Sequence, residues 1–228
     1  MVYIWIAVGI VVFCLLYTFV LRPWHMQWGT QGDETTRPLP GDDIVEDPLA
    51  IATHGITIRA SAEEVWPFLV QIGQDRGGFY SYDWLENLFG CDIHNVEHVV
   101  PEYQNLQVDE GVRLHPKAPP LKVIELEKNR VLLIAGGTRF LDGVRDTSFL
   151  RLHLYPAYSW VFVLDEQPDR TTRFIARVRA RWNTGFVGFC RNRLFLEPAH
   201  SIMQRKMNYG LRDVVEAAKR KQAEAAHD

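Results

Sequence analysis

The sequence predicts an α+β fold in which a curved antiparallel sheet wraps around one long C-terminal helix, preceded by one N-terminal transmembrane helix. Short strand-like runs follow one another between residues 111 and 182, with turn residues between them. An apolar stripe from Ile202 to Ala218 has the spacing of a helix face. The first residues form a long uncharged run. Consecutive short strands imply an antiparallel meander, which must curve to hold the last helix.

The uncharged run extends from Val2 to Leu21. As a helix its length is about 30 Å, the thickness of a bilayer's hydrocarbon core. Aromatic residues lie near both of its ends, as in an aromatic belt: Tyr3, Trp5, Tyr17 and Trp24. No Lys or Arg precedes the run, as a cleavable signal peptide would require, so we expect a retained single-pass anchor over residues 1–23. Arg22 follows it, and the positive-inside rule then favours a cytoplasmic domain.

Residues 24–52 are polar, acidic and rich in Pro and Gly. Such a composition is typical of an extended linker. Four apolar side chains could pin the linker onto the domain: Trp28, Leu39, Ile44 and Val45. The folded domain is then expected over residues 53–228.

The domain opens with a strand from His54, followed by a helix. Ser61 and Glu64 form a capping box at the start of this helix. A second short helix is expected from Tyr82 to Leu88, with Trp84, Leu85 and Leu88 as its buried side.

Further strands are expected at Gly111–His115, Leu121–Glu127, Arg130–Ala135, Val144–Leu154, Tyr158–Asp165 and Thr172–Trp182. The last helix is expected from about Pro198 to about Ala225. Gly210 interrupts its apolar stripe, either as a gap beside a ligand or as a place of close packing.

The stretch ITIRASAEEVWPFLVQIGQDRGGFYSYDWLENLFG resembles the SRPBCC, or START-like, superfamily. Two later pieces, Val99–Gln104 and Met203–Met207, also fit, and the resemblance covers roughly residues 28 to 218. That group holds lipid-transfer domains, polyketide cyclases and quinone-binding proteins. The resemblance implies a helix-grip fold with a ligand cavity, but no shared catalytic residue.

A cavity between such a sheet and its helix would be lined by aromatic and methionine side chains: Phe79, Tyr80, Tyr82, Trp84, Trp160, Phe162, Met203 and Met207. The expected ligand is a hydrophobic or amphipathic small molecule of the lipid, isoprenoid or quinone class. The alternative is a solid core, in which case the domain is a non-catalytic interaction module.

A polar cluster lies in the Gly-flanked turn before the second short helix: Arg76, Tyr80, Tyr82, Asp83 and Glu86. Arg76 is a candidate ligand-binding residue. Asp83, Tyr80 and Tyr82 are candidate acid–base groups for an enzyme of the cyclase or dehydratase type. Helix capping and surface pairing would explain the same residues, and we favour binding without catalysis.

The C-terminal part of the chain is basic. Between Arg170 and Lys221 there are 13 Lys or Arg against 3 acids, which suggests an anionic partner such as lipid head groups. Nucleic acid is not expected, because no nucleic-acid-binding motif accompanies the charge. Arg173, Arg177, Arg179 and Arg181 share one face of a strand. We expect that face to point outward, as a solvated surface that could meet anionic lipid or pair with neighbouring acids. Facing inward, the arginines would bind an anionic group of a ligand.

No metal or cofactor is expected. Cys91, His94 and His98 are zinc-binding residue types, but a structural site needs four ligands. Phosphate loops and dinucleotide fingerprints are absent from the sequence. The apolar segment from Trp182 to Leu196 could touch the bilayer beside the anchor, or serve as a lid or a packed connection.

Overall fold

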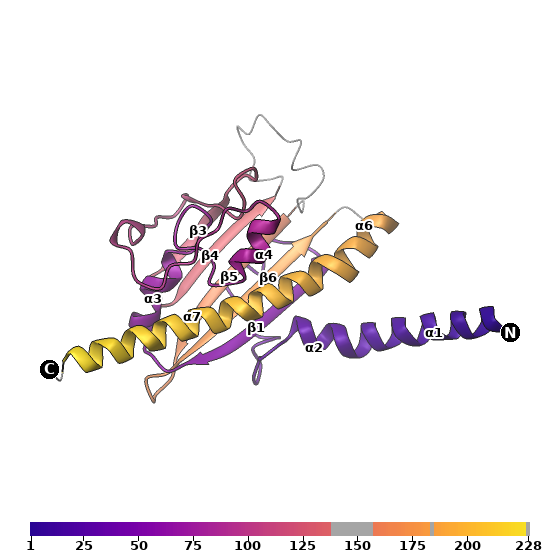
Figure 1. The fold of residues 1–228 in the computed structure, drawn as a ribbon, viewed down its shortest axis with the longest axis horizontal. Coiled ribbons are helices and arrows are strands. Elements are labelled where there is room, and N and C mark those ends of the chain that lie inside the picture. The colour runs from indigo at the N-terminus through magenta and orange to yellow at the C-terminus, as the bar shows by residue number, and fades with distance from the viewer. Residues whose placement is uncertain (138–156, 183–184, 227–228) are drawn as a thin grey trace.

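The computed structural model describes residues 1–137, 157–182 and 185–226 (Figure 1). Its helices are α1 Val2–Leu16, α2 Arg22–Met26, α3 Ala62–Val70, α4 Asp83–Leu88, α6 Phe186–Arg191 and α7 Glu197–Ala225. Tyr17–Leu21 (η1) and Asn192–Leu196 (η4) are π-helical turns, and Pro101–Tyr103 (η2) is a 3₁₀ turn. The strands are β1 Ala50–Ile58, β2 Gly111–Val112, β3 Leu121–Glu127, β4 Val131–Gly137, β5 Ala157–Glu166 and β6 Thr172–Arg181. The expected strand Val144–Leu154 lies outside the described residues.

The six strands form one antiparallel sheet in the order β1-β6-β5-β4-β3-β2. The first strand therefore lies beside the last. A register shift between Val123 and Glu125 interrupts the pairing of β3 with β4, and such bulges bend a sheet. Helix α7 lies along one face (Figure 1). The expected antiparallel sheet gripping a C-terminal helix is confirmed, although β1 begins at Ala50 rather than at His54.

The main core lies between α7, α3 and the inner face of the sheet. Met207, Leu211 and Val215 of α7 are fully buried there. Ile202 was expected on the same stripe but is exposed, because α7 meets the sheet along a face that runs through Met203 and Met207 instead. The capping box of Ser61 and Glu64 is present, as expected.

Helix α4 faces the other way from the prediction. Trp84 and Leu88 are 65% and 72% exposed, whereas Glu86 is buried. A helix of six residues makes less than two turns, so the spacing of its apolar residues is too short to define a buried face.

The outer face of the sheet is covered by residues 27–49. Leu39 and Val45 are buried, and Leu39 packs on Val131, Leu133 and Ile175 in a second apolar cluster. The stretch expected to be an extended linker is therefore folded onto the domain. The side chains that were expected to pin it do contact the domain.

The same stretch covers the arginines of β6. Arg173 binds both carboxylate oxygens of Glu34, with Nε 2.6 Å from Oε1, and Arg177 binds Asp42 at 2.6 Å. Arg173 and Arg177 are only 7% and 3% exposed. The expected outward orientation and pairing with acids are present, but the expectation of a solvated surface was wrong for Arg173 and Arg177. Their side chains do point away from α7, but acids and carbonyl groups of residues 29–42 neutralise and bury them.

The covering stretch reaches the outer face by crossing the edge strand β1. Gly55 N–H donates to the carbonyl of Trp28, and Gly29 has a φ of +73°. A Cβ on Gly29 would collide with the Gly55 carbonyl, so this close approach needs glycine. The crossing also covers part of an edge strand that would otherwise present unpaired backbone groups.

Removing the acid partner of a buried arginine should destabilise the fold. We expect Glu34→Ala to lower the free energy of unfolding by about 3–5 kcal/mol, because Arg173 stays buried without a counter-charge. The matched control is Glu127→Ala, whose partner Arg130 lies on the surface, with an expected loss below about 1 kcal/mol. Denaturant unfolding of the two variants in one detergent measures both losses. Equal small losses would show that the outer-face ion pair does not hold the covering stretch.

Candidate functional site

An internal cavity lies between α7 and the inner face of the sheet. It has two chambers of about 210 and 260 Å³. Leu114, Tyr158 and His200 line both chambers, so the two adjoin. Apolar atoms of the described residues contribute most of the surface of both chambers, as is typical of small-molecule sites.

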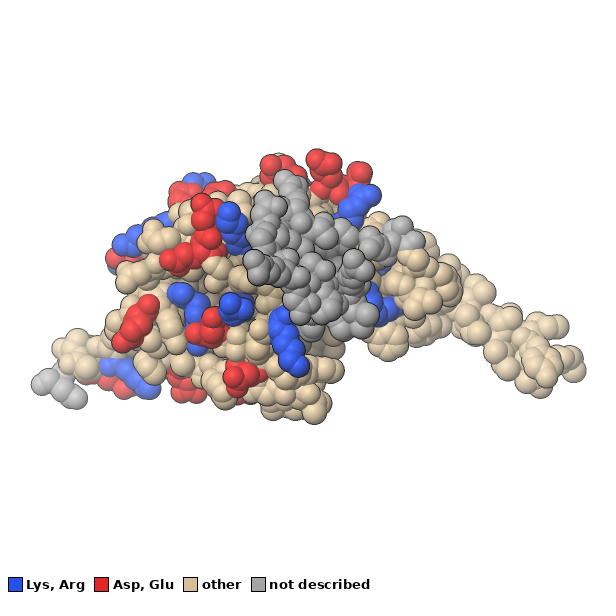
Figure 2. All heavy atoms as spheres, turned by 90° about the horizontal axis from the view of Figure 1, so that it is seen from above, with Lys and Arg blue, Asp and Glu red and all other residues tan. Residues whose placement is uncertain are grey.

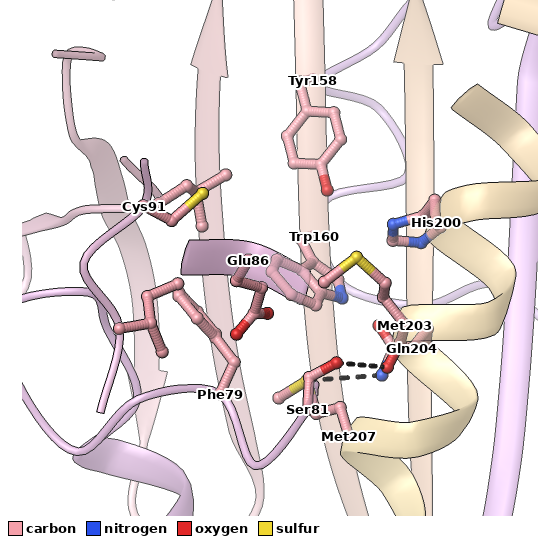
Figure 3. Close-up of a pocket in the computed structure, with 12 residues that line it drawn as sticks. Phe79, Ser81, Glu86, Cys91, Tyr158, Trp160, His200, Met203, Gln204 and Met207 are labelled. Carbon is pink, nitrogen blue, oxygen red and sulfur yellow. Dashed lines mark hydrogen bonds between the residues drawn. The ribbon is translucent and has the colours of Figure 1, made fainter. Parts of the chain in front are cut away.

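The first chamber is bounded by one face of α7 and by strand β5 (Figure 3). His200, Met203, Gln204 and Met207 recur at positions i, i+3, i+4 and i+7, so they share the helix face toward the sheet. Trp160 projects from β5 between them and Phe79, and its ring stacks on Phe79 with 6.1 Å between centroids. His200 lies edge-on to the same indole at 6.0 Å.

The loop before α4 forms a further wall of this chamber and contacts α7 at Met203 and Gly210. Asn95 holds it, because its Oδ1 accepts from the backbone N–H groups of Phe79 and Tyr80 at 3.0 and 2.7 Å. Ser81 Oγ then donates to the carbonyl of Met203 at 3.1 Å and ties the loop to α7 (Figure 3). Gly210 lets this loop approach, since a Cβ there would collide with the Tyr80 carbonyl. The glycine in the stripe of α7 therefore reflects close packing.

Glu86 of α4 is the one acid among the described residues that line the first chamber. It is 7% exposed, and its Oε2 has no hydrogen-bond partner among the described residues. Burial raises the pKa of this carboxyl to about 7, and the charge of Asp83 adds to the effect. Glu86 is therefore able to exchange a proton near neutral pH.

Two histidines stand near the junction of the chambers, with ring centroids 6.2 Å apart. Burial lowers the pKa of His200 to about 3 and that of His54 to about 4, so both are neutral. His54 Nε2–H donates to the carbonyl of His25 at 2.8 Å. His200 Nε2 has no partner among the described residues.

The second chamber touches the end of the N-terminal helix. Met26 of α2 lines it, together with Trp182 and the first turn of α7. Glu197, which also lines it, is held by Arg22 at 2.8 Å and by Arg193 at 2.9 Å. The negative charge in this chamber is therefore already paired.

Four of the nine predicted ligand-binding residues line the first chamber: Phe79, Trp160, Met203 and Met207. Phe162 lies in the core behind them, where its ring stacks on Phe174 and meets Trp160 at a tilt. Trp84 is exposed, and Tyr82 lies beside it with a ring distance of 6.5 Å, outside both chambers.

The remaining predicted residues have other partners. The Tyr80 hydroxyl donates to the carbonyl of Phe68 and accepts from Gln71, and burial raises its pKa. Arg76 donates to the carbonyls of Val70 and Tyr103. Asp83 is exposed and accepts from the backbone N–H of Trp84. None of these candidates lines a chamber.

The polar residues that do line the first chamber were not predicted as ligand contacts: Ser81, Glu86, Cys91, Tyr158, His200 and Gln204. One signal was present. His200 and Gln204 stand three residues before Met203 and Met207, so they continue the same helix face. No group of three His, Cys, Asp or Glu side chains among the described residues is placed to hold a metal ion.

The raised pKa of Glu86 makes stability depend on pH. Between the ordinary value of 4.5 and about 7, the folded protein keeps a proton that the unfolded chain has released, so stability falls as pH rises. Glu86→Gln should therefore gain about 1–3 kcal/mol over wild type between pH 4.5 and 8, discounted for solvent in the cavity. Denaturant unfolding of wild type and Glu86→Gln at pH 4.5 and at pH 8 measures the difference in their free energies of unfolding. The lowered pKa values of His54 and His200 make stability rise with pH, but this contribution is the same in wild type and in Glu86→Gln. A difference independent of pH would contradict the prediction, and the exposed Glu63→Gln should show none.

Comparisons with known proteins give structural matches. No family model matches the sequence, and no curated protein matches it. Among solved structures, protein MLL2253 from Mesorhizobium loti is 14% identical, covering 74% of this chain and 98% of its own, with a TM-score of 0.41. Norcoclaurine synthase from Thalictrum flavum is 13% identical, covering 82% and 98%, with a TM-score of 0.39. The Polyketide_cyc-like protein Cgl2372 from Corynebacterium glutamicum is 13% identical, covering 78% and 96%, with a TM-score of 0.34.

At these scores, what those proteins bind or catalyse does not carry over to this chain. The strand order, the antiparallel register and the helix laid along the inner face already define the fold. The chain thus has the helix-grip fold that its resemblance to the SRPBCC, or START-like, superfamily implies.

Proposed function

We propose that this protein is a membrane-anchored domain that binds a hydrophobic or amphipathic small molecule in its internal cavity. The observation that carries the proposal is the cavity itself, which α7 and the sheet leave open although aromatic and methionine side chains surround it. Together the chambers reach the lower part of the range of about 300–1,000 Å³ that ligand pockets occupy. Burial of an apolar ligand there would contribute about 25 cal/mol per Å².

The N-terminal helix supports membrane attachment. Val2–Met26 is one continuous helix of 25 residues, long and apolar enough to cross a bilayer. It projects from the domain, and its outer part carries no charged side chain in Figure 2, whereas charges of both signs are spread over the domain. Arg22, at its C-terminal side, favours a cytoplasmic domain.

The end of this helix is fixed to the start of the C-terminal helix. The Tyr17 hydroxyl donates to the carbonyl of Arg193, Arg22 pairs with Glu197, and His25 Nδ1 lies 2.9 Å from Ser201 Oγ. Since Met26 lines the second chamber, a ligand would have a short path between the bilayer and the cavity.

A second apolar surface lies at the same end of the molecule. Helix α6 and the turn η4 lie next to the C-terminal end of the N-terminal helix (Figure 1), where the Tyr17 hydroxyl donates to the carbonyl of Arg193 in η4. Their exposed side chains are Phe186, Val187, Phe189, Leu194 and Phe195. An apolar helical segment beside a membrane anchor, with Arg191 and Arg193 at the interface, suits contact with lipid. We propose that this segment rests on the bilayer.

Filling the cavity should remove the ligand. Met203→Trp places an indole in the first chamber, so small molecules that co-purify with wild type should fall at least tenfold. The matched control is Ile202→Trp, one residue along α7 on its exposed side, which should keep them. Mass spectrometry of extracts from the full chain in detergent measures the yield. Equal yields from both variants would overturn the proposal.

Contact of α6 with the bilayer can be tested by measuring whether a label on α6 is buried among the lipids. In a background without native cysteines, Phe186→Cys labelled with an environment-sensitive fluorophore should be quenched by spin-labelled lipids in phosphatidylcholine vesicles. The control label at Ala223→Cys, near the far end of α7, should remain in water (Figure 1). If both labels respond alike, α6 does not rest on the membrane.

A further inference from the structure

The first chamber contains buried polar atoms that have no partner among the described residues. They are Glu86 Oε2, Trp160 Nε1, His200 Nε2 and Gln204 Oε1. Gln204 directs its amide nitrogen to Asn208 at 2.7 Å, so its oxygen is left over. Leaving such atoms unpaired is unfavourable, and a ligand or ordered water would satisfy them.

These atoms lie around one chamber and come from three elements. Glu86 belongs to α4, Trp160 to β5, and His200 and Gln204 to the face of α7 turned toward them (Figure 3). Glu86 and Trp160 are each 7% exposed, so they are removed from bulk water. The rest of the lining is largely apolar, and includes Phe79, Met203 and Met207.

The charge of the lining selects among ligand classes. No Lys or Arg is among the described residues that line either chamber. A carboxylate or phosphate head would lose its water without gaining a cation, and Glu86 would repel it once ionised. The indole N–H of Trp160 can only donate, so it suits an oxygen acceptor and opposes an ammonium group.

We propose that Glu86, Trp160, His200 and Gln204 bind the uncharged oxygen group, hydroxyl or carbonyl, of an otherwise apolar ligand, and that the cavity rejects anionic heads. Trp160 donates to the oxygen. Glu86 and Gln204 accept from a hydroxyl, and a protonated Glu86 donates to a carbonyl. This inference rests on the proposed function and narrows its ligand class: fatty acids and phospholipid heads are excluded, and alcohols and quinone-like carbonyl compounds fit.

The test uses three photoreactive probes that share one alkyl chain with a diazirine and end in an alcohol, a carboxylate or an amine. The full chain in phosphatidylcholine nanodiscs is labelled at pH 8. Labelling of peptides that carry Trp160 and residues 200–207 is divided by labelling of Val2–Met26, which corrects for the partition of each probe into the bilayer. This ratio of cavity labelling to labelling of Val2–Met26, called the alcohol ratio or the carboxylate ratio after the probe used, should be at least tenfold higher for the alcohol than for the carboxylate.

Three variants separate head-group recognition from general packing. Trp160→Phe should lower the alcohol ratio about fivefold, because it keeps a ring but loses the donor. Glu86→Gln should raise the carboxylate-to-alcohol ratio about fivefold, because it removes the repulsion, whereas Glu63→Gln on the surface should leave that ratio unchanged.

The outcomes distinguish this inference from the proposed function. Saturable cavity labelling that is equal for all heads, or strongest for the carboxylate, overturns the inference and leaves ligand binding intact. If the amine probe labels the cavity most strongly and this labelling is lost in Glu86→Gln, the cavity recognises a cation and the inferred preference for an uncharged oxygen group is wrong. If none of the probes labels the cavity and nothing co-purifies with wild type, the proposed function itself fails.

Discussion

The burial of Arg173 and Arg177 on the outer face of the sheet is the constraint from which the arrangement follows. Two cations out of water require counter-charges, and Glu34 and Asp42 supply them. Because these acids belong to the chain that follows the N-terminal helix, that chain must cross the edge of the sheet and lie flat on it. The end of the N-terminal helix is also held against η4 and the start of α7 by Tyr17, Arg22 and His25, and this places the second chamber beside that end of the helix.

On the inner face of the sheet, the side chains of α7 do not fill the space between the helix and the strands, and a cavity remains. Ser81 and the Tyr80 backbone contact α7 near Met203 and Gly210, and Asn95 keeps the loop rigid at that point. These contacts set the distance between the loop and the helix. The side chains between them include Met203 and Met207, whose long unbranched chains adapt to an occupant more readily than branched residues do. The cavity is therefore a consequence of where polar contacts stop the approach.

Much of the fold could be predicted because its signals are local. The capping box of α3, the shared face of the arginines in β6 and the apolar stripe of α7 can each be recognised within one element. The face of β6 could not be predicted in full, since Arg173 and its partner Glu34 are 139 residues apart. The site was predicted in part for the same reason. Trp160, Met203 and Met207 lie on long elements whose faces are fixed by period, whereas Trp84 and Glu86 lie on a six-residue helix whose orientation depends on contacts.

The charges of the molecule are divided between the two faces of one sheet. The basic C-terminal part of the chain, residues 170–221, suggested an anionic partner. Its strand arginines are paired with the acids of residues 34–47, so this part presents less free charge than its composition indicates. On the inner face, burial keeps His54 and His200 neutral, and Glu197 is paired with Arg193. Burial also raises the pKa of Glu86 to about 7. A chamber that avoids net charge next to an apolar helix favours occupants that are themselves soluble in the bilayer. Under the proposed membrane anchoring by Val2–Met26, the same burial that excludes charge from the cavity suits it to ligands that partition into the bilayer.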